Sequence, residues 1–288
     1  MVRALVYCSI AYVAALLAAL TVGALLPPTL HPVWVALIAD VVATFVVFGF
    51  SVQLNNSSMY DPYWSVAPLP LGVYFAWQAG LGPRALLVLA GVAVWGARLT
   101  YNFFRGWHGL EHEDWRYVRI REKTGRAYWL VSLLGIHLFP TLMVFGGCLP
   151  LYAALGPGAR PLNLVDLFAC VVTAAAVAIE AIADAQLRRF RLRRDRLPDE
   201  IMAEGLWARS RHPNYFGEIL FWWGLWLFAV AAGPQHVWTG VGALAITLMF
   251  RLVSLRLLET RMLERRPAYA ARIRSLPAFV PYGSANPE

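Results

Sequence analysis

The feature that most constrains this chain is a succession of long apolar runs, separated by short turns or by arginine-rich stretches. The first run extends from about Ala4 to Leu26, and a helix needs about 20 such residues to cross the ~30 Å hydrocarbon core of a bilayer. Hydrophobic residues make up 59% of the sequence, more than in ordinary soluble domains. The pattern therefore predicts an all-α, polytopic integral membrane bundle.

Eight runs can be distinguished, and the shortness of the third leaves the number of transmembrane helices at seven or eight. Their approximate ranges are 4–26, 34–54, 66–79, 84–104, 128–155, 164–191, 213–232 and 238–258. The basic, amphipathic stretch 259–274 predicts a C-terminal helix that lies at the membrane surface. Because no repeat or low-complexity segment divides the chain, we expect residues 1–288 to form a single membrane domain.

Arginine is concentrated in residues 105–127, residues 188–213 and the tail, whereas the turns between the other runs hold only Arg160. Loops rich in lysine and arginine stay on the cytoplasmic side of a membrane. With eight spans, this distribution predicts that both termini are cytoplasmic. It also accounts for the net charge of +8 without nucleic acid as a partner.

Side chains that bind metals are not arranged as a clear site. The three cysteines all lie inside apolar runs, where packing is their expected role: Cys8, Cys148 and Cys170. One charged loop holds four closely spaced side chains of ligand type: His108, Glu111, His112 and Asp114. They lie among arginines and lack a third histidine, so a metal there is the weaker interpretation and no metal site is predicted.

Charged side chains inside the predicted spans are the strongest sign of function. Four of them occur at i, i+4, i+8 and i+11 in the sixth run: Glu180, Asp184, Arg188 and Arg191. At about 100° per residue they fall within an arc of roughly 80°, on one helix face. Arg251 interrupts the last run in a similar way. Structural ion pairs, or arginines that extend to the membrane surface, would explain the same residues without a ligand.

A second polar pair, Asn214 and Glu218, follows Pro213, a residue suited to the first turn of a helix. Residues four apart share a helix face, and Arg98 and Asn102 repeat this spacing in the fourth run. Arginines that converge on one cavity favour a ligand with phosphates, because guanidinium groups fit phosphate oxygens. The sequence has neither a G-x-G-x-x-G after a strand nor a P-loop, so a nucleotide would have to lie among the helices.

Three stretches resemble the DUF1295 family of bacterial membrane proteins: Ser210–Glu218, Tyr60–Ser65 and Ala97–Asn102. That family is in turn similar to the steroid 5-alpha-reductase C-terminal domain, here over residues 130–280 and most strongly from about Glu180 to Pro277. The resemblance implies a multi-pass enzyme of the bacterial inner membrane. Its implied reaction is the NADPH-dependent reduction of a carbon–carbon double bond conjugated to a carbonyl, in an apolar, steroid- or isoprenoid-like substrate.

The cofactor residues of those reductases carry over by motif. Their Asn-x-x-Gly-Glu element falls on Asn214 and Glu218, and its asparagine helps to bind the cofactor. Their Asp-x-x-x-Arg-x-x-Arg element and a late arginine fall on further charged residues, while Glu180 stands where the reductases have asparagine. The resemblance thus implies these NADPH-binding residues: Glu180, Asp184, Arg188, Arg191, Asn214, Glu218 and Arg251.

In the reductases an acidic residue and a tyrosine polarise the substrate carbonyl. The same mutual spacing falls here on Asp61 and Trp95, with Arg98 nearby, and these three are the implied catalytic residues. Trp95 has no acidic phenol, so Asp61 would act in its protonated form or through a neighbouring tyrosine, such as Tyr60 or Tyr63. A helix cap at Asp61 is the structural alternative.

Two other functions stay open. The stretch from Arg211 to Gly217, with Glu259 and the tail, also resembles membrane methyltransferases of the isoprenylcysteine carboxyl methyltransferase type, whose Arg-His-Pro element and late glutamate belong to the S-adenosylmethionine site. A non-enzymatic transporter or assembly factor is the third class, although no inverted repeat typical of transporters is visible. The sequence favours the reductase and leaves the identity of the substrate and the oligomeric state open.

Overall fold

The structure is a computed structural model that describes residues 2–156 and 158–282. Every regular element in these residues is helical, and seven helical segments are long and apolar enough to cross a membrane. They are Val2–Leu25, Pro32–Gln53, Pro83–Gly106, Trp115–Leu155, Leu164–Leu192, Pro213–Ala232 and Pro234–Arg265. The predicted all-α, polytopic membrane protein is confirmed, because in lipid a helix satisfies all of its own backbone hydrogen bonds.

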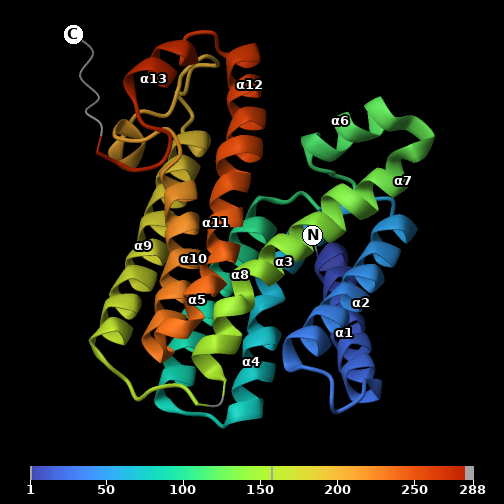
Figure 1. Ribbon diagram of the computed structural model, residues 1–288. Coiled ribbons are helices and arrows are strands. Elements are labelled where there is room, and N and C mark those ends of the chain that lie inside the picture. Colours follow the sequence, from blue (N-terminus) through green and yellow to red (C-terminus); the bar gives the residue numbers. More distant parts are fainter. Residues whose placement is uncertain (1, 157, 283–288) are drawn as a thin grey trace. The chain divides into compact units, whose positions relative to one another are not determined.

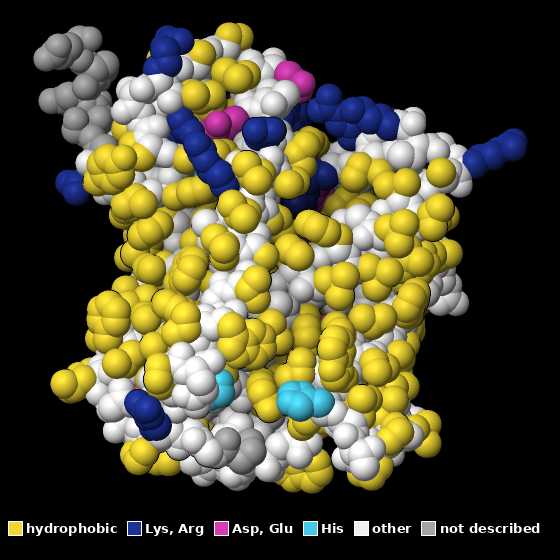
Figure 2. All heavy atoms as spheres, in the orientation of Figure 1, with side chains coloured by type: hydrophobic (Ala, Val, Ile, Leu, Met, Phe, Trp, Pro, Cys, Tyr) yellow, Lys and Arg dark blue, Asp and Glu magenta, His cyan; other side chains and the backbone are white. Residues whose placement is uncertain are grey.

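The chain divides into two compact units, unit 1 (Met1–Pro161) and unit 2 (Leu162–Glu288). The expected single membrane domain over residues 1–288 stays a prediction, because compactness alone does not establish independent folding. Hydrophobic side chains cover most of the visible surface of both units (Figure 2). Large exposed ones include Leu20, Leu86 and Leu167, as expected of helices that face lipid.

Unit 1 begins with the helix pair α1 (Val2–Leu25) and α2 (Pro32–Gln53), which lie side by side (Figure 1). The buried face of α1 consists of small side chains at helical spacing: Ala4, Cys8, Ala11 and Ala15. Small residues let two membrane helices approach closely. The other elements of unit 1 are η1 (Ser57–Tyr60), α3 (Tyr63–Val66), α4 (Pro68–Ala79), α5 (Pro83–Gly106), α6 (Trp115–Thr124), η2 (Gly125–Ala127), α7 (Tyr128–Val131), η3 (Ser132–Leu138) and α8 (Phe139–Leu155).

The third predicted span, residues 66–79, differs from the structure. The helix there, α4, has 12 residues and is not among the seven segments long enough to cross a membrane. Its start is fixed by Pro68, which lies at the first helical position after α3 has ended at Val66. Helix α4 packs against α5 and α8 and is therefore part of the bundle of unit 1.

Unit 2 is formed around α9 (Leu164–Leu192) and α10 (Pro213–Ala232), with the segment from α11 (Gly240–Met249) to α12 (Leu255–Arg265) alongside (Figure 1). Its shorter elements are η4 (Gly205–Ala208), η5 (Pro234–Thr239), η6 (Phe250–Ser254) and α13 (Tyr269–Ser275). The predicted surface helix over 259–274 is interrupted: α12 continues to Arg265, and α13 starts again two residues after Pro267.

Two of the long segments contain a stretch of π-helix, η3 in unit 1 and η6 in unit 2. A π-helical turn is wider than an α-helical turn and occurs frequently at functional sites. His137 lies in η3, and Arg251 lies in η6. Both segments therefore interrupt a span at an ionisable side chain.

Candidate functional site

The first candidate site lies on the seam between α9 and α10 in unit 2. Helix α9 starts with a capping box formed by Asn163 and Asp166, and α10 starts with Pro213. A Cβ on Gly217 would lie 2.7 Å from Glu180 Cβ, and one on Gly224 would lie 2.5 Å from Thr173 Oγ1. The two glycines, seven residues apart, therefore allow the helices to touch at their backbones.

Polar side chains from both helices meet on this α9–α10 seam. Asn214 donates from Nδ2 to Asp184 Oδ1 at 3.4 Å, and Trp222 donates from Nε1 to Glu218 Oε1 at 2.8 Å. Glu180 and Glu218 are each only 4% exposed. Among the described residues, the buried Asn214 Oδ1 has no hydrogen-bond partner. The seam thus holds the acidic and amide residues that the sequence singled out.

The three arginines expected to bind phosphates are placed differently. Arg188 is half-buried on α9, whereas Arg191 near the end of α9 and Arg251 in η6 are exposed in unit 2. Arg188 and Arg191 continue the helix face that begins at Glu180, as predicted. Arg251 belongs to η6, whereas Asp184 and Asn214 belong to α9 and α10.

A second cluster in unit 2 surrounds His212, which the sequence placed in a basic loop. The structure buries this side chain at the N-terminus of α10. His212 Nε2 lies 3.3 Å from Glu259 Oε1 and 3.4 Å from the hydroxyl of Tyr269. Arg211 Nε also pairs with Glu259 Oε1, at 2.8 Å. Burial raises the pKa of Tyr269 to about 12, and the Glu259 carboxylate acts in the same direction.

Residues next to His212 also hold the C-terminal tail in place through hydrogen bonds. Arg211 donates from its backbone nitrogen to Pro277 O at 3.0 Å and from Nη1 to Ile273 O at 2.7 Å. Ser210 donates from Oγ to Phe279 O at 2.6 Å. The stretch that opens α10 therefore both starts the helix and holds the tail against it.

In unit 1, Asp61 is joined to a tyrosine that sequence reasoning missed. The hydroxyl of Tyr117, on α6, donates a hydrogen bond to Asp61 Oδ1, and Arg116 Nη2 lies 3.9 Å from the same oxygen. Burial raises the pKa of the Asp61 carboxyl to about 7, although Arg116 and Tyr117 lower it. No spacing rule points to Tyr117, because it lies 56 residues away on a separate short helix.

The structure corrects one expectation about Asp61, the helix cap, and leaves its expected partners as predictions. Asp61 caps no helix through its side chain, because α3 follows Pro62 without a side-chain cap. Tyr60 bonds Thr141 at 2.6 Å, and the phenol that donates to Asp61 is that of Tyr117; a role for Tyr60 or Tyr63 beside Asp61 stays a prediction. Trp95, the expected partner, is fully buried on α5 with its ring 6.1 Å from that of Trp64. Arg98 lies one turn further along α5 and is half-buried.

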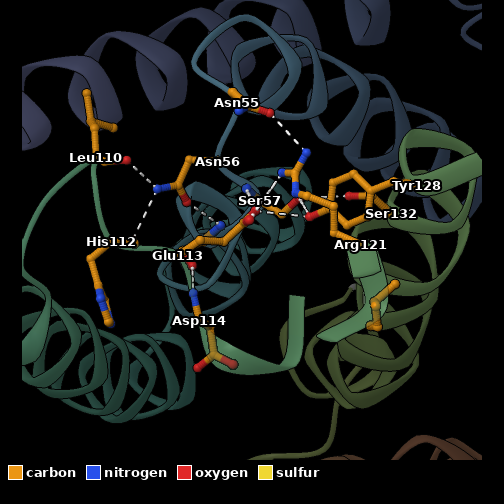
Figure 3. Close-up of polar contacts among 12 residues, drawn as sticks. Asn55, Asn56, Ser57, Leu110, His112, Glu113, Asp114, Arg121, Tyr128 and Ser132 are labelled. Carbon is orange, nitrogen blue, oxygen red and sulfur yellow. Dashed lines mark hydrogen bonds and ion pairs between the residues drawn. The ribbon is translucent and has the colours of Figure 1, made fainter. Parts of the chain in front are cut away.

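The loop before α6 is held to η1 by a dense set of polar contacts (Figure 3). Asn56 donates to the backbone oxygens of Leu110 and His112, at 2.7 and 3.1 Å. Glu113 Oε1 accepts from the backbone nitrogen of Ser57 at 2.8 Å, and Arg121 Nη2 pairs with Glu113 Oε2 at 3.1 Å. These contacts fix the position of α6 and therefore of Tyr117.

The metal hypothesis for this loop finds no set of ligands. In residues 2–156 and 158–282, no group of three or more His, Cys, Asp or Glu side chains is close enough to hold a metal ion. Asp114 accepts instead from the backbone nitrogen and from Nε of Arg116, at 2.9 and 2.7 Å. The rings of His108 and His112 lie 5.5 Å apart and nearly perpendicular.

The helical spans and the buried polar residues define a polytopic membrane protein with ionisable groups inside its bundle. Comparison with known families gives a match to the family described as "Protein of unknown function (DUF1295)" over residues 47–275, and the chain belongs to that family. An uncharacterized protein of Schizosaccharomyces pombe is 30% identical over 265 residues, covering 83% of this chain and 76% of the relative. No solved structure matches.

Proposed function

We propose that this protein is a membrane-embedded, NADPH-dependent reductase of a carbon–carbon double bond conjugated to a carbonyl in an apolar, steroid- or isoprenoid-like substrate. The observation that carries the proposal is Asn214 on the α9–α10 seam, whose buried Oδ1 has no hydrogen-bond partner among the described residues. Leaving such an atom unsatisfied costs about 1–3 kcal/mol. A bound amide or hydroxyl group would supply the missing hydrogen bond.

The acidic, amide and arginine side chains along the α9–α10 seam are distributed as the binding of a dinucleotide requires. Asp184 and Asn214 would hold the nucleoside end through hydroxyl and amino groups, with Glu180 and Glu218 in support. Arg188 and Arg191, one helical turn from each other, would bind the phosphates, and we assign Arg251 to the same role. When bound, NADPH supplies the hydride, and these side chains bind and orient it.

The second chemical requirement is a proton donor that also polarises the substrate carbonyl. We assign this role to Tyr117, whose hydroxyl is held by Asp61. A carboxyl with a pKa of about 7 is suited to exchange protons at neutral pH. The phenol that Trp95 lacks is thereby supplied from α6. Arg116, beside the same carboxyl, stabilises it whenever it is ionised.

Ligand binding tests the proposal directly. Purified protein in detergent is titrated with NADPH and with S-adenosylmethionine by calorimetry, and we expect heat only from NADPH. Asn214→Ala should weaken NADPH binding about tenfold, since one buried hydrogen bond is lost. Gln235→Ala, an exposed amide just beyond the opposite end of α10, is the control and should bind normally.

Arg251→Ala should also weaken NADPH binding, and unchanged affinity would remove that residue from the site.

A second candidate function rests on the cluster around His212. Sequence reasoning named Arg211, His212 and Glu259 as the elements of an S-adenosylmethionine-dependent membrane methyltransferase, and these three side chains are in contact in unit 2. Binding of S-adenosylmethionine but not NADPH in the same titration would replace the reductase with the methyltransferase. Arg211 and His212 already satisfy Glu259, so the first proposal ranks higher.

We further propose that the chain is held in a bacterial inner (cytoplasmic) membrane with its C-terminus in the cytoplasm. The expectation that both termini are cytoplasmic requires an eighth crossing, by α3 and α4 together, because the seven long segments alone place the termini on opposite sides. The support is the resemblance to bacterial membrane proteins and the arginine-rich ends of the spans. An apolar substrate that dissolves in the bilayer would then reach the bundle from the side. A test of the membrane orientation is given below.

A further inference from the structure

A line of hydrogen-bonding side chains enters unit 1 from its charged loop. Glu113 Oε1 lies 3.0 Å from the hydroxyl of Tyr128, which lies 2.7 Å from Ser57 Oγ. Ser57 Oγ lies 2.9 Å from Ser132 Oγ, and Ser132 Oγ lies 3.4 Å from His137 Nδ1. Five side chains from four segments thus form one unbroken relay, and Figure 3 shows its outer four members.

Only one end of this relay reaches water. Ser57, Ser132 and His137 are fully buried, and Tyr128 is 2% exposed. The Glu113 side chain is 12% exposed, and its partner Arg121 is 31% exposed. Hydroxyl groups of this kind can pass a proton along a chain, because each accepts one hydrogen while donating another. A buried chain of hydrogen-bonded side chains with one end exposed to solvent can therefore carry protons and not larger ions.

His137 has partners for either state of its ring. With a proton on Nε2 only, that nitrogen donates to Ser51 Oγ at 3.1 Å, and Ser51 donates to Val47 O at 3.1 Å. Nδ1 is then free to accept from Ser132 Oγ. With a second proton, Nδ1 donates to Ser132 O at 3.0 Å. Both the neutral and the protonated imidazole are thus hydrogen-bonded, which is the requirement for a histidine that exchanges protons.

The π-helical segment η3 creates this arrangement. Ser132 and His137 are five residues apart, and the wide turn places both the carbonyl and the hydroxyl of Ser132 near His137 Nδ1. The groups that face His137 from other elements are uncharged: Ser51 and Phe48 from α2, and Tyr60 from η1, with its ring 4.8 Å away. Thr141, on α8, bonds the backbone of His137 and not its ring.

We propose that His137 is a proton-exchanging site inside the membrane span, connected to water at the charged loop through Glu113, Tyr128, Ser57 and Ser132. In one passage the Glu113 carboxyl gives a proton to Tyr128, and each hydroxyl gains one proton and gives up another. His137 Nδ1 gains the last one, so that Glu113 ends ionised and His137 protonated. Glu113 then takes a proton from water. This proposal goes beyond the reductase and requires neither NADPH nor substrate.

Exchange of the His137 ring protons with water tests the proposal. Full-length protein labelled with ¹⁵N-histidine is placed in phosphatidylcholine vesicles, and exchange is measured by solid-state NMR, with the His137 signal identified from His137→Gln. We expect exchange in the unaltered protein despite complete burial. Tyr128→Phe should slow it about tenfold or more, because without the Tyr128 hydroxyl the Ser57 hydroxyl is no longer connected to Glu113; the backbone nitrogen of Ser57, which still bonds Glu113, cannot pass the proton on.

The matched control is Tyr60→Phe. Tyr60 is as buried as Tyr128 and packs on the same histidine, but its hydroxyl bonds Thr141 and lies outside the relay. Tyr128→Phe keeps the aromatic ring under the Arg121 guanidinium, 3.8 Å away, so the fold should persist. If it does not, Ser57→Ala interrupts the same relay. Equal slowing in Tyr60→Phe, or unchanged exchange in both relay variants, would overturn the proposal, as would an absence of exchange in the unaltered protein.

Discussion

At Asp61 the carboxyl group is buried beside a hydrogen-bond donor, Tyr117, and a cation, Arg116. Burial dominates and raises its pKa to about 7, whereas the unfolded chain titrates near 3.8. The folded protein therefore keeps a proton on Asp61 over a range of pH in which the unfolded chain has lost it. By linkage, folding stability contributed by this group is full below about pH 4 and is lost as pH rises through about 7.

A pH series of thermal unfolding checks this sign. In detergent, the unaltered protein should lose stability between about pH 4 and about pH 7 more steeply than Asp61→Asn, whose amide does not ionise. The amide oxygen of this variant can still accept the hydrogen bond from Tyr117. The control is Asp199→Asn, at an exposed loop of unit 2, which should follow the unaltered protein. Parallel curves for Asp61→Asn and the unaltered protein would contradict the assignment.

Tyr117→Phe separates chemistry from cofactor binding. The variant keeps the ring and loses the hydroxyl that we assign to the substrate carbonyl. Removal of a general acid lowers the rate by about 10²- to 10⁴-fold. We expect this loss in the reduction of an apolar enone, followed by NADPH absorbance, with unchanged affinity for NADPH. Tyr101→Phe, at an exposed tyrosine on α5, is the control and should retain activity. A fully active Tyr117→Phe would show that this phenol has no part in the reaction.

At the scale of the helices, the α9–α10 contact depends on two glycines that no polar pattern reveals. The backbone of α9 lies so close to Gly217 that an added Cβ would be 2.8 Å from Ala176 O and 2.9 Å from Glu180 N. These are backbone atoms, which cannot rotate away as a side chain can. The close approach is what brings Asn214 to Asp184 and buries Glu180.

Gly217→Ala should therefore separate the two helices. Overpacking of this kind destabilises a protein by about 1–3 kcal/mol, and the altered seam should also weaken NADPH binding. Gly49→Ala is the control, because nothing lies within 4 Å of its added Cβ on α2. Alanine there should be neutral or stabilising by about 0.5–1 kcal/mol, owing to its better helix propensity. Equal thermal stability of the two variants in detergent would argue against close packing at Gly217.

At the scale of the whole molecule, the arginine-rich ends of the spans predict the orientation in the membrane. Glu122, on α6, and Asp199, after α9, both belong to arginine-rich stretches and are exposed. Gln235 lies in the short turn after α10, which carries no arginine. The positive-inside rule places the first two on the cytoplasmic side and the third on the opposite side.

Single cysteines at these positions test the orientation. In a background without Cys8, Cys148 and Cys170, a membrane-impermeant maleimide added outside intact cells should label Gln235→Cys. The same reagent should label Glu122→Cys and Asp199→Cys only after the membrane is opened. Permeabilised cells, in which all three react, give the control for expression. Labelling of Glu122→Cys and Gln235→Cys from the same side would contradict the predicted orientation.

The sequence by itself determined that this is a polytopic helical membrane protein. It also determined which polar residues share a face on α9 and which share one on α10. Apolar runs of membrane length fix the helices, and the spacing of Glu180, Asp184 and Arg188 fixes their common face, because both depend only on local helical geometry. Asn214 and Glu218 follow for the same reason.

Only the tertiary structure decided which helices meet and which side chains pair across them. Tyr117 donates to Asp61, Glu259 lies beside His212, and Ser57 joins Tyr128 to Ser132. Each of these contacts joins residues that are 47 or more positions apart in the chain. Contacts at such separations depend on how the helices pack, and the packing in turn depends on small residues and wide helical turns that the apolar pattern does not record.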